Sequence, residues 1–354
     1  MNEIVDQIEE VLCSLKPVET ESAERWPHDA LRAVGAAGAW RSIIPAKWGG
    51  AELAYADLLR TYETIAKHSV ALALILTQRD GACDLIARGD NPALKDRVLP
   101  RHAGGERFTT VGIAQLTTSK GAGGPKARAR RVAGGFVLDG LVPWATGAAH
   151  CDEIVVGAVT ADDLQLLVCL PRDAEGVIVQ PPARLMALSE TDTSMIELND
   201  VRVGDEHVIR GPCGQALSGR APVKGLTVSA VGIGLASAIH QRLTELEEHQ
   251  PPELREPIAP LHAEYGETRD ALRAAAARVG DQESRADAPE IRVRVNALLT
   301  RLAVTLLNIS KGGGFVSGRP AERLLREAMF FHVWSSPVNI QAGTLRRLLG
   351  AAEA

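Results

Sequence analysis

Apolar residues recur at helical spacing along about the first hundred residues of the chain. Near the start, one face of a predicted helix carries Ile4, Val5, Ile8, Val11, Leu12 and Leu15. Further helices are predicted over residues 27–37, 55–67 and 69–88. Another helix begins at Asp90-Asn91-Pro92, where a capping residue precedes a proline suited to a first helical turn. This first segment is therefore predicted to be all-helical.

The pattern changes after Gly105 to short runs, most of them rich in β-branched residues, separated by turn signals such as Ala133-Gly134-Gly135. Strands are predicted over residues 108–114, 128–132, 136–142, 153–159, 164–170, 176–180 and 194–203. So many short strands within about a hundred residues are typical of a β-barrel or sandwich. The helical pattern returns from about Val223, with breaks at residues 250–252, 280–288 and 311–320.

This order predicts an α+β multidomain protein. We expect an N-terminal all-helical domain over residues 1–107, a central β-domain over 108–213 and a C-terminal helical domain over 214–354. The sequence contains no internal repeat and no low-complexity tract.

Charge and cysteine content exclude several classes of protein. The chain carries 39 Lys+Arg against 44 Asp+Glu, a formal net charge of −5, so no nucleic-acid partner is expected. The five cysteines are widely spaced and form no Cys-x-x-Cys pair, which argues against a disulfide framework or a metal site. The N-terminus is acidic, unlike a signal peptide, and apolar runs fall short of the roughly 20 residues that span a bilayer. We expect a soluble cytoplasmic protein with no membrane partner.

A tryptophan motif follows one predicted strand. The strand segment Gly135–Gly140 leads to Trp144-Ala145-Thr146. An indole is a large, rigid surface for stacking on a flat ring system, and a hydroxyl beside it can hydrogen-bond a ring atom. Alone, the pattern is weak and is better explained by a strand-end Trp that fills the core.

The chain resembles the acyl-CoA dehydrogenase superfamily in this motif and in the loop before it. In the family the Trp lies against a flavin ring and the third residue of the motif meets flavin N5. The segment 116–125 resembles the family loop that cradles the flavin, which implies roles for Leu116, Thr117 and Gly123. Gly123 stands where the family has a Ser that holds the pyrophosphate. Backbone N–H groups of a glycine-rich turn still bind anions.

The resemblance extends along most of the chain. The segments 44–50, 95–100 and 199–203 are similar to family motifs of the N-terminal and central domains. Gly312-Gly313-Gly314-Phe315 and the segment 320–328 together are the most specific match, because their joint spacing is not explained by a loop and a helix alone. The resemblance implies a C-terminal four-helix bundle, FAD as cofactor, and a homodimer or homotetramer.

Both positions where the family carries its catalytic Glu hold other residues. Ser335 occupies the usual position and Lys224 the alternative one. A Ser hydroxyl without a partner and a protonated Lys are not bases at neutral pH. His332, three residues before Ser335, has a suitable intrinsic pKa but is more simply explained by packing near a helix end.

Cofactor contacts of the family are altered as well. The resemblance implies that Asn308 stands for a Gln that contacts the dinucleotide and that Gly312 belongs to the adjoining glycine loop, whose first Gly is replaced by Lys311. Pro251 and Leu254 occupy the places of an Arg and a Phe that reach the FAD of a neighbouring subunit. FAD is therefore the expected cofactor, with FMN or no cofactor as alternatives.

These observations leave three hypotheses for function. The first is an FAD-dependent oxidoreductase acting on the CH–CH group of an acyl thioester or related substrate, with an electron-transfer flavoprotein as partner. The second is a flavin-dependent monooxygenase or oxidase on the same fold, which needs no α-proton base and, as a monooxygenase, needs a flavin reductase. The third is a non-catalytic paralogue with a binding role.

Overall fold

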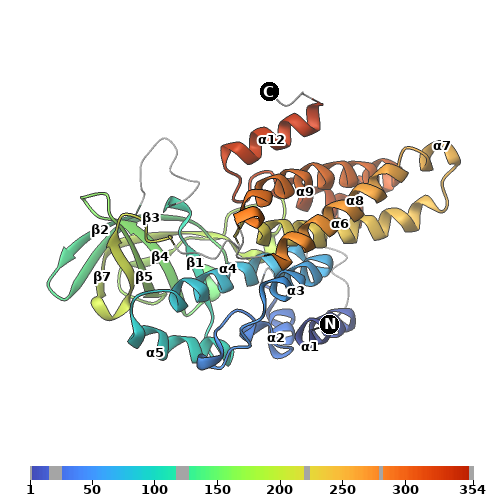
Figure 1. Cartoon of the computed structure of the whole chain (residues 1–354). Coiled ribbons are helices and arrows are strands. Elements are labelled where there is room, and N and C mark those ends of the chain that lie inside the picture. The colour runs from blue at the N-terminus through green and yellow to red at the C-terminus, as the bar shows by residue number, and fades with distance from the viewer. Residues whose placement is uncertain (1, 16–25, 117–126, 219–223, 279–281, 351–354) are drawn as a thin grey trace.

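The computed structural model describes residues 2–15, 26–116, 127–218, 224–278 and 282–350 (Figure 1). The chain runs from a helical segment through one β-sheet into a second set of helices, which confirms the predicted fold class. Figure 1 shows the sheet on one side of the molecule and the long C-terminal helices on the other. Within the described residues, none of the helices combines the length and hydropathy needed to cross a bilayer.

The N-terminal segment folds as predicted, with residues that favour helix starts at its boundaries. Its α-helices are α1 (Glu3–Ser14), α2 (His28–Ala36), α3 (Tyr55–His68), α4 (Val70–Ala87) and α5 (Pro92–Ala103). Asn2, Ser69 and Asn91 each accept a hydrogen bond from a backbone N–H in the first turn of the following helix. Most of α4 is buried around its whole circumference, because it lies between the C-terminal helices and the sheet.

One mixed sheet holds all eight strands of the central segment. They are β1 (Thr109–Gly112), β2 (Ala127–Val132), β3 (Gly135–Ala145), β4 (Glu153–Val159), β5 (Gln165–Pro171), β6 (Val177–Val179), β7 (Ser194–Gly204) and β8 (Val208–Cys213). The order is β6-β7-β3-β2-β4-β5-β8, and β1 pairs with β4. A single parallel pair, Arg128 with Val159, joins β2 to β4, so two nearly separate halves face each other like a sandwich.

Strand β8 corrects the sequence prediction. A Gly-Pro pair such as Gly211-Pro212 usually ends a strand. Strand β8 nevertheless forms at the edge of the sheet, where it pairs with β5 alone. Proline is tolerated at such an edge because its missing N–H faces away from the ladder. Strand β3 also extends beyond the predicted range of 136–142 to Ala145, so Trp144 lies within the end of the strand rather than after it.

The C-terminal segment contains three long helices, α6 (Lys224–Glu247), α8 (Ala259–Ala277) and α9 (Gln282–Ile309). Shorter helices complete it: α7 (Pro252–Arg255), α10 (Lys311–Gly314), α11 (Pro320–Phe330) and α12 (Val338–Leu349). The expected break over residues 280–288 ends sooner than predicted, because α9 begins at Gln282.

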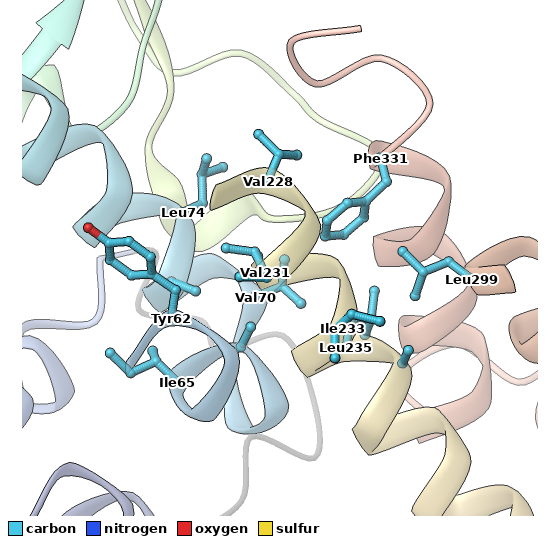
Figure 2. Close-up of a cluster of buried hydrophobic side chains, with 14 of the residues drawn as sticks. Tyr62, Ile65, Val70, Leu74, Val228, Val231, Ile233, Leu235, Leu299 and Phe331 are labelled. Atoms are coloured by element: carbon cyan, nitrogen blue, oxygen red, sulfur yellow. The ribbon is translucent and has the colours of Figure 1, made fainter. Parts of the chain in front are cut away.

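The two helical segments share one hydrophobic core. Figure 2 shows Tyr62, Ile65 and Leu74 of α3 and α4 facing Val228 and Val231 of α6. Helix α6 comes so close to α3 that a Cβ on Gly234 would stand 2.3 Å from the carbonyl oxygen of Glu63. Boundaries at residues 107/108 and 213/214 remain predictions, but the helices on either side of the sheet do not form separate cores.

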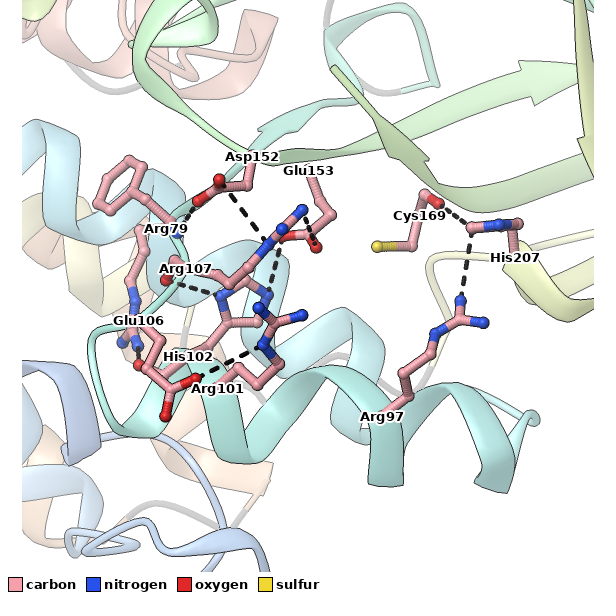
Figure 3. A network of polar contacts seen from close by, with 11 residues as sticks. Arg79, Arg97, Arg101, His102, Glu106, Arg107, Asp152, Glu153, Cys169 and His207 are labelled. Carbon is pink, nitrogen blue, oxygen red and sulfur yellow. Dashed lines mark hydrogen bonds and ion pairs between the residues drawn. The ribbon is translucent and has the colours of Figure 1, made fainter. Parts of the chain in front are cut away.

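A polar network joins helix α5 to the sheet (Figure 3). Arg107 binds Glu153 at 2.9 Å, and the backbone N–H of Phe108 donates to Asp152 at 2.7 Å. His102 is buried, and its Nδ1–H donates to the carbonyl oxygen of Arg107 at 3.0 Å. Burial, together with the nearby Arg79 and Arg107, lowers the pKa of His102 to about 4 even though a Glu153 oxygen lies 3.6 Å from Nε2.

We expect His102 to make the fold less stable in mild acid. Its pKa is about 4 in the folded protein and about 6.5 when unfolded, so the unfolded state binds the extra proton between these pH values. Stability should fall as the pH drops through this window, by about 2 kcal/mol between pH 7 and pH 5 from this residue. Urea unfolding at both pH values measures the change. His102→Gln should remove that share, and an unchanged pH dependence in the variant would contradict the assignment.

Candidate active site

A cavity of about 850 Å³ lies where the N-terminal helices, the sheet and the C-terminal helices meet. Its walls come from the loop before α3, from α3 and α4, from the ends of β1 and β3, from the loop before β7, and from α6 and α11. Aromatic rings gather there although the chain has few of them, and the cavity is lined by Tyr55, Tyr62, Trp144, Phe330 and Trp334.

Trp144 reaches the cavity because of a β-bulge. Val142 pairs with Ile196 and Ala145 with Ser194, so β3 has one residue more than β7 in this interval. The extra residue puts Trp144 in the left-handed region, at φ 59°, and leaves its side chain 60 % exposed. Bulges re-aim side chains in this way near functional sites. A strand-end Trp that fills the core is thereby excluded for Trp144.

Thr146 lines the same cavity two residues later. It is buried, and its carbonyl oxygen accepts a hydrogen bond from the Thr110 hydroxyl at 2.7 Å. Its own hydroxyl lies 3.2 Å from that of Thr193, which also lines the cavity. The motif therefore presents an open indole face and a hydroxyl to one space.

The turn after α11 forms another part of the cavity wall. Phe330 and Trp334 stack with ring centroids 5.5 Å apart and planes 20° from parallel. Ser335 follows, exposed to the cavity with φ 46°. Buried Arg292 holds this turn by donating to the carbonyl oxygens of Phe331 and Trp334, at 2.8 and 3.0 Å. Burial lowers the pKa of Arg292 to about 9, which leaves it charged at neutral pH.

Hydroxyl donors lie at the α3 side of the cavity. Burial raises the pKa of Tyr55, whose hydroxyl hydrogen-bonds Thr227, and burial also raises the pKa of Tyr62. Tyr62 donates to Asp80 at 2.7 Å. Both phenols are therefore neutral at physiological pH and act as hydrogen-bond donors, not as bases.

The carboxylates that line the cavity among the described residues are already engaged. Glu52 accepts the backbone N–H of Ala46 at 3.0 Å, and Asp84 pairs with Arg88 one helical turn later. No cluster of three or more His, Cys, Asp or Glu side chains suited to a metal occurs in the part of the chain that the structure describes. The site thus combines aromatic surfaces and hydroxyls without an unengaged carboxylate among these lining residues.

Gly81 leaves a notch in the cavity wall. It lies within α4, where glycine costs helix stability relative to alanine. A Cβ at this position would meet only the Val111 side chain, at 4.0 Å, so no neighbouring protein atom requires glycine there. The missing side chain instead keeps space open for whatever occupies the cavity.

Comparison with known proteins supplies the family. The model for the acyl-CoA dehydrogenase N-terminal domain matches residues 3–106. A probable acyl-CoA dehydrogenase of Bacillus subtilis, YngJ, is 22 % identical over 345 residues, which cover 92 % of this chain and 90 % of the relative. These matches support membership of the acyl-CoA dehydrogenase superfamily.

Solved structures of similar fold include dehydrogenases and other flavin-binding proteins. A glutaryl-coenzyme A dehydrogenase in complex with glutaryl-CoA superposes with a TM-score of 0.84 at 19 % identity, covering 99 % of this chain and 95 % of that one. TdsC from Paenibacillus sp. A11-2, solved with FMN and indole, gives 0.83 at 16 % identity, covering 99 % and 98 %. At these identities the likeness establishes the acyl-CoA dehydrogenase fold.

The cavity brings together some of the residues predicted from the family resemblance and leaves others outside. Trp144, Thr146 and Ser335 line it together. The Leu116 side chain is buried in the core against Gly157 and does not line the cavity. The predicted contact of Leu116 with the flavin could therefore involve only its backbone, and it stays a prediction. Thr117 and Gly123 lie outside the described residues, as does the side chain of Lys224 at the start of α6.

Asn308 and Gly312 do not line the cavity. Both are exposed, at the end of α9 and in α10, and their contact with a dinucleotide stays a prediction. His332 also lies outside the cavity lining, with its Nε2 bonded to the Thr300 hydroxyl at 2.7 Å. Burial lowers the pKa of His332, which keeps the ring neutral at physiological pH.

Sequence reasoning missed the α4 wall of the site. The cavity is lined on that side by Leu74, Thr77, Gln78, Gly81, Asp84, Ala87 and Arg88. The polar members recur at helical spacing within a helix that is largely apolar apart from Arg79 and Asp80, and that stripe was the available signal.

We expect Gly81→Ala to stabilise the protein and to weaken occupancy of the cavity. The Cβ should raise the free energy of unfolding by about 0.5–1 kcal/mol, since glycine is a poor helix residue and the position has room. Thermal denaturation and ligand titration measure the two effects. Gly234→Ala is the matched control, because its Cβ would clash with Glu63 and should lower stability. Unchanged ligand affinity in Gly81→Ala would show that the notch is not used.

Proposed function

We propose that this member of the superfamily is a flavin-dependent oxidoreductase that binds FAD and oxidises the CH–CH group of an acyl thioester or related substrate. The observation that carries the proposal is that a bulge turns Trp144 into the same cavity as the hydroxyl of Thr146. A flat ring needs a platform and a polar contact at its edge, and these two residues offer both.

The residues present fit a flavin. An open indole face and the Gly81 notch leave room for a flat ring system, in a cavity whose size is typical of ligand sites. Bound there, a flavin would accept a hydride. The stacked Phe330 and Trp334 add aromatic surface to the cavity wall, and the Tyr55 hydroxyl, which hydrogen-bonds Thr227, lies on the α3 side. FMN is the alternative cofactor, and the TdsC structure was determined with it.

Ser335 supports a second candidate function. Abstraction of an α-proton from a thioester needs a positioned base, but the wall at this point ends in a hydroxyl and the lining carboxylates Glu52 and Asp84 are engaged. A flavin-dependent monooxygenase or oxidase needs no such base. The first candidate implies an electron-transfer flavoprotein as partner, and a monooxygenase implies a flavin reductase.

We further propose that the protein is a cytoplasmic homodimer or homotetramer. Exposed apolar side chains at the end of α9 and beside α10 support this, since Val304, Phe315 and Val316 are 52 %, 79 % and 52 % exposed. Asn308 and Gly312 lie beside these residues in the sequence, so a neighbouring subunit at this surface would cover them as well.

Absorbance spectroscopy tests the cofactor. The purified protein should be yellow or take up added FAD, and Trp144→Ala should weaken flavin binding about three- to tenfold because a stacking platform is lost. Trp144→Phe is the control that keeps an aromatic face and should retain most of the affinity. A colourless protein that takes up neither FAD nor FMN would leave only the hypothesis of a non-catalytic paralogue with a binding role.

Restoring a carboxylate tests the reaction. Ser335→Glu should gain α-proton abstraction, seen as anaerobic bleaching of bound flavin by acyl-CoA thioesters, while Ser335→Gln of nearly equal size should not. If neither wild type nor Ser335→Glu bleaches with any chain length, the dehydrogenase candidate is wrong and the oxygen-using candidate takes its place.

A further inference from the structure

Three threonine hydroxyls form a chain that leads from the cavity into the protein. The hydroxyl of Thr146 lies 3.2 Å from that of Thr193, which lies 2.8 Å from that of Thr191. The Thr191 hydroxyl in turn donates to the carbonyl oxygen of Leu188 at 2.8 Å. Thr146 and Thr193 line the cavity, whereas Thr191 is fully buried behind them.

The last link fixes the direction of the others. A hydroxyl has one proton to donate, and a carbonyl oxygen only accepts, so the proton of Thr191 is committed to Leu188. Thr191 therefore accepts from Thr193, which leaves Thr193 only lone pairs to offer Thr146. The proton of Thr146 points at Thr193, and the free side of its oxygen carries lone pairs.

The turn that carries this chain is held from several sides. Leu188 and Asp192 have φ values of 64° and 39°, which non-glycine residues adopt only under constraint. His150 binds Asp192 at 2.8 Å, and Trp26 stacks on His150 with ring centroids 4.4 Å apart. The backbone N–H of Gly147 donates to the carbonyl oxygen of Thr191 at 2.9 Å. These contacts fix the anchor of the chain relative to the Trp144–Thr146 motif.

We propose that Thr193 is a positioning residue that holds the Thr146 hydroxyl as a hydrogen-bond acceptor toward the cavity. The inference rests on the proposed function, in which the ligand is a flavin. Reduced flavin carries ring N–H groups that oxidised flavin lacks, and an acceptor pairs only with the N–H form. The hydrogen-bonded row of threonine hydroxyls thereby favours binding of reduced over oxidised flavin.

The test compares Thr193→Val with Thr193→Ser in the full-length protein. Valine matches the shape of threonine without the hydroxyl, which frees the Thr146 proton to donate to the ligand, whereas serine keeps the chain. Dissociation constants for oxidised FAD and for anaerobically reduced FAD are measured by titration for each protein. Wild type and Thr193→Ser should have the same ratio of constants. Thr193→Val should weaken reduced relative to oxidised FAD about three- to tenfold, with a lower midpoint potential.

Two further variants guard against a merely structural effect. Thr146→Val removes the acceptor without creating a donor, so it should shift the ratio in the same direction by a smaller amount. Thr191→Val cuts the chain one link deeper and takes the place of Thr193→Val if that variant does not fold.

The outcomes separate the two proposals. If wild type binds FAD and both Thr193→Val and Thr191→Val keep its ratio of constants, the positioning role is wrong while the proposed function stands. If wild type binds neither redox form, the proposed function is wrong and the positioning role falls with it.

Discussion

A buried ion pair in the middle of α4 holds the architecture around the cavity. Arg79 is 1 % exposed and binds Asp80 at 2.7 Å, and it also donates to the carbonyl oxygens of Trp40 and His102. Asp80 accepts from Tyr62 on its other oxygen. Three neighbouring segments are thereby tied to one helix. Removing either charge would leave the other buried and unpaired, which is far more destabilising than replacing both. Burial raises the pKa of Asp80 against the opposing effect of Arg79, so the pair depends on its full set of partners.

The position of α4 explains why the cavity can carry strain. One end of the helix packs in the core shared by both helical segments, and the other packs against β1, β4 and β5. Strand β4 is buried on both faces between this packing and the interior of the sheet. Trp144 and Ser335 adopt left-handed backbone conformations in the wall of the cavity that lies between these layers. Such conformations persist only where the surroundings over-determine them.

Much of the fold and part of the candidate site were predictable from the sequence, and the features that the prediction missed have physical causes. Helices with apolar faces and short β-rich strands between turn signals were visible, and so was the Trp144–Thr146 motif through a family resemblance. The bulge that exposes Trp144 was not, because it depends on pairing with β7. The α4 wall was missed because the same helix also carries the buried Arg79 and Asp80, so polar residues alone do not tell which side faces a cavity. The direction of the Thr191–Thr193–Thr146 chain requires distances that no spacing encodes.

The close contact of Gly234 with α3 has a consequence for synthesis of the chain. The N-terminal helices leave the ribosome first, but the apolar faces of α3 and α4 are completed by α6, which follows the whole sheet in sequence. Until residues of α6 emerge, those faces have no native partner and are open to aggregation or to chaperones. The core of the first segment is therefore completed only after the sheet and α6 have been synthesised. In a nascent chain halted before α6, this core would lack its packing partner however well α3 and α4 form.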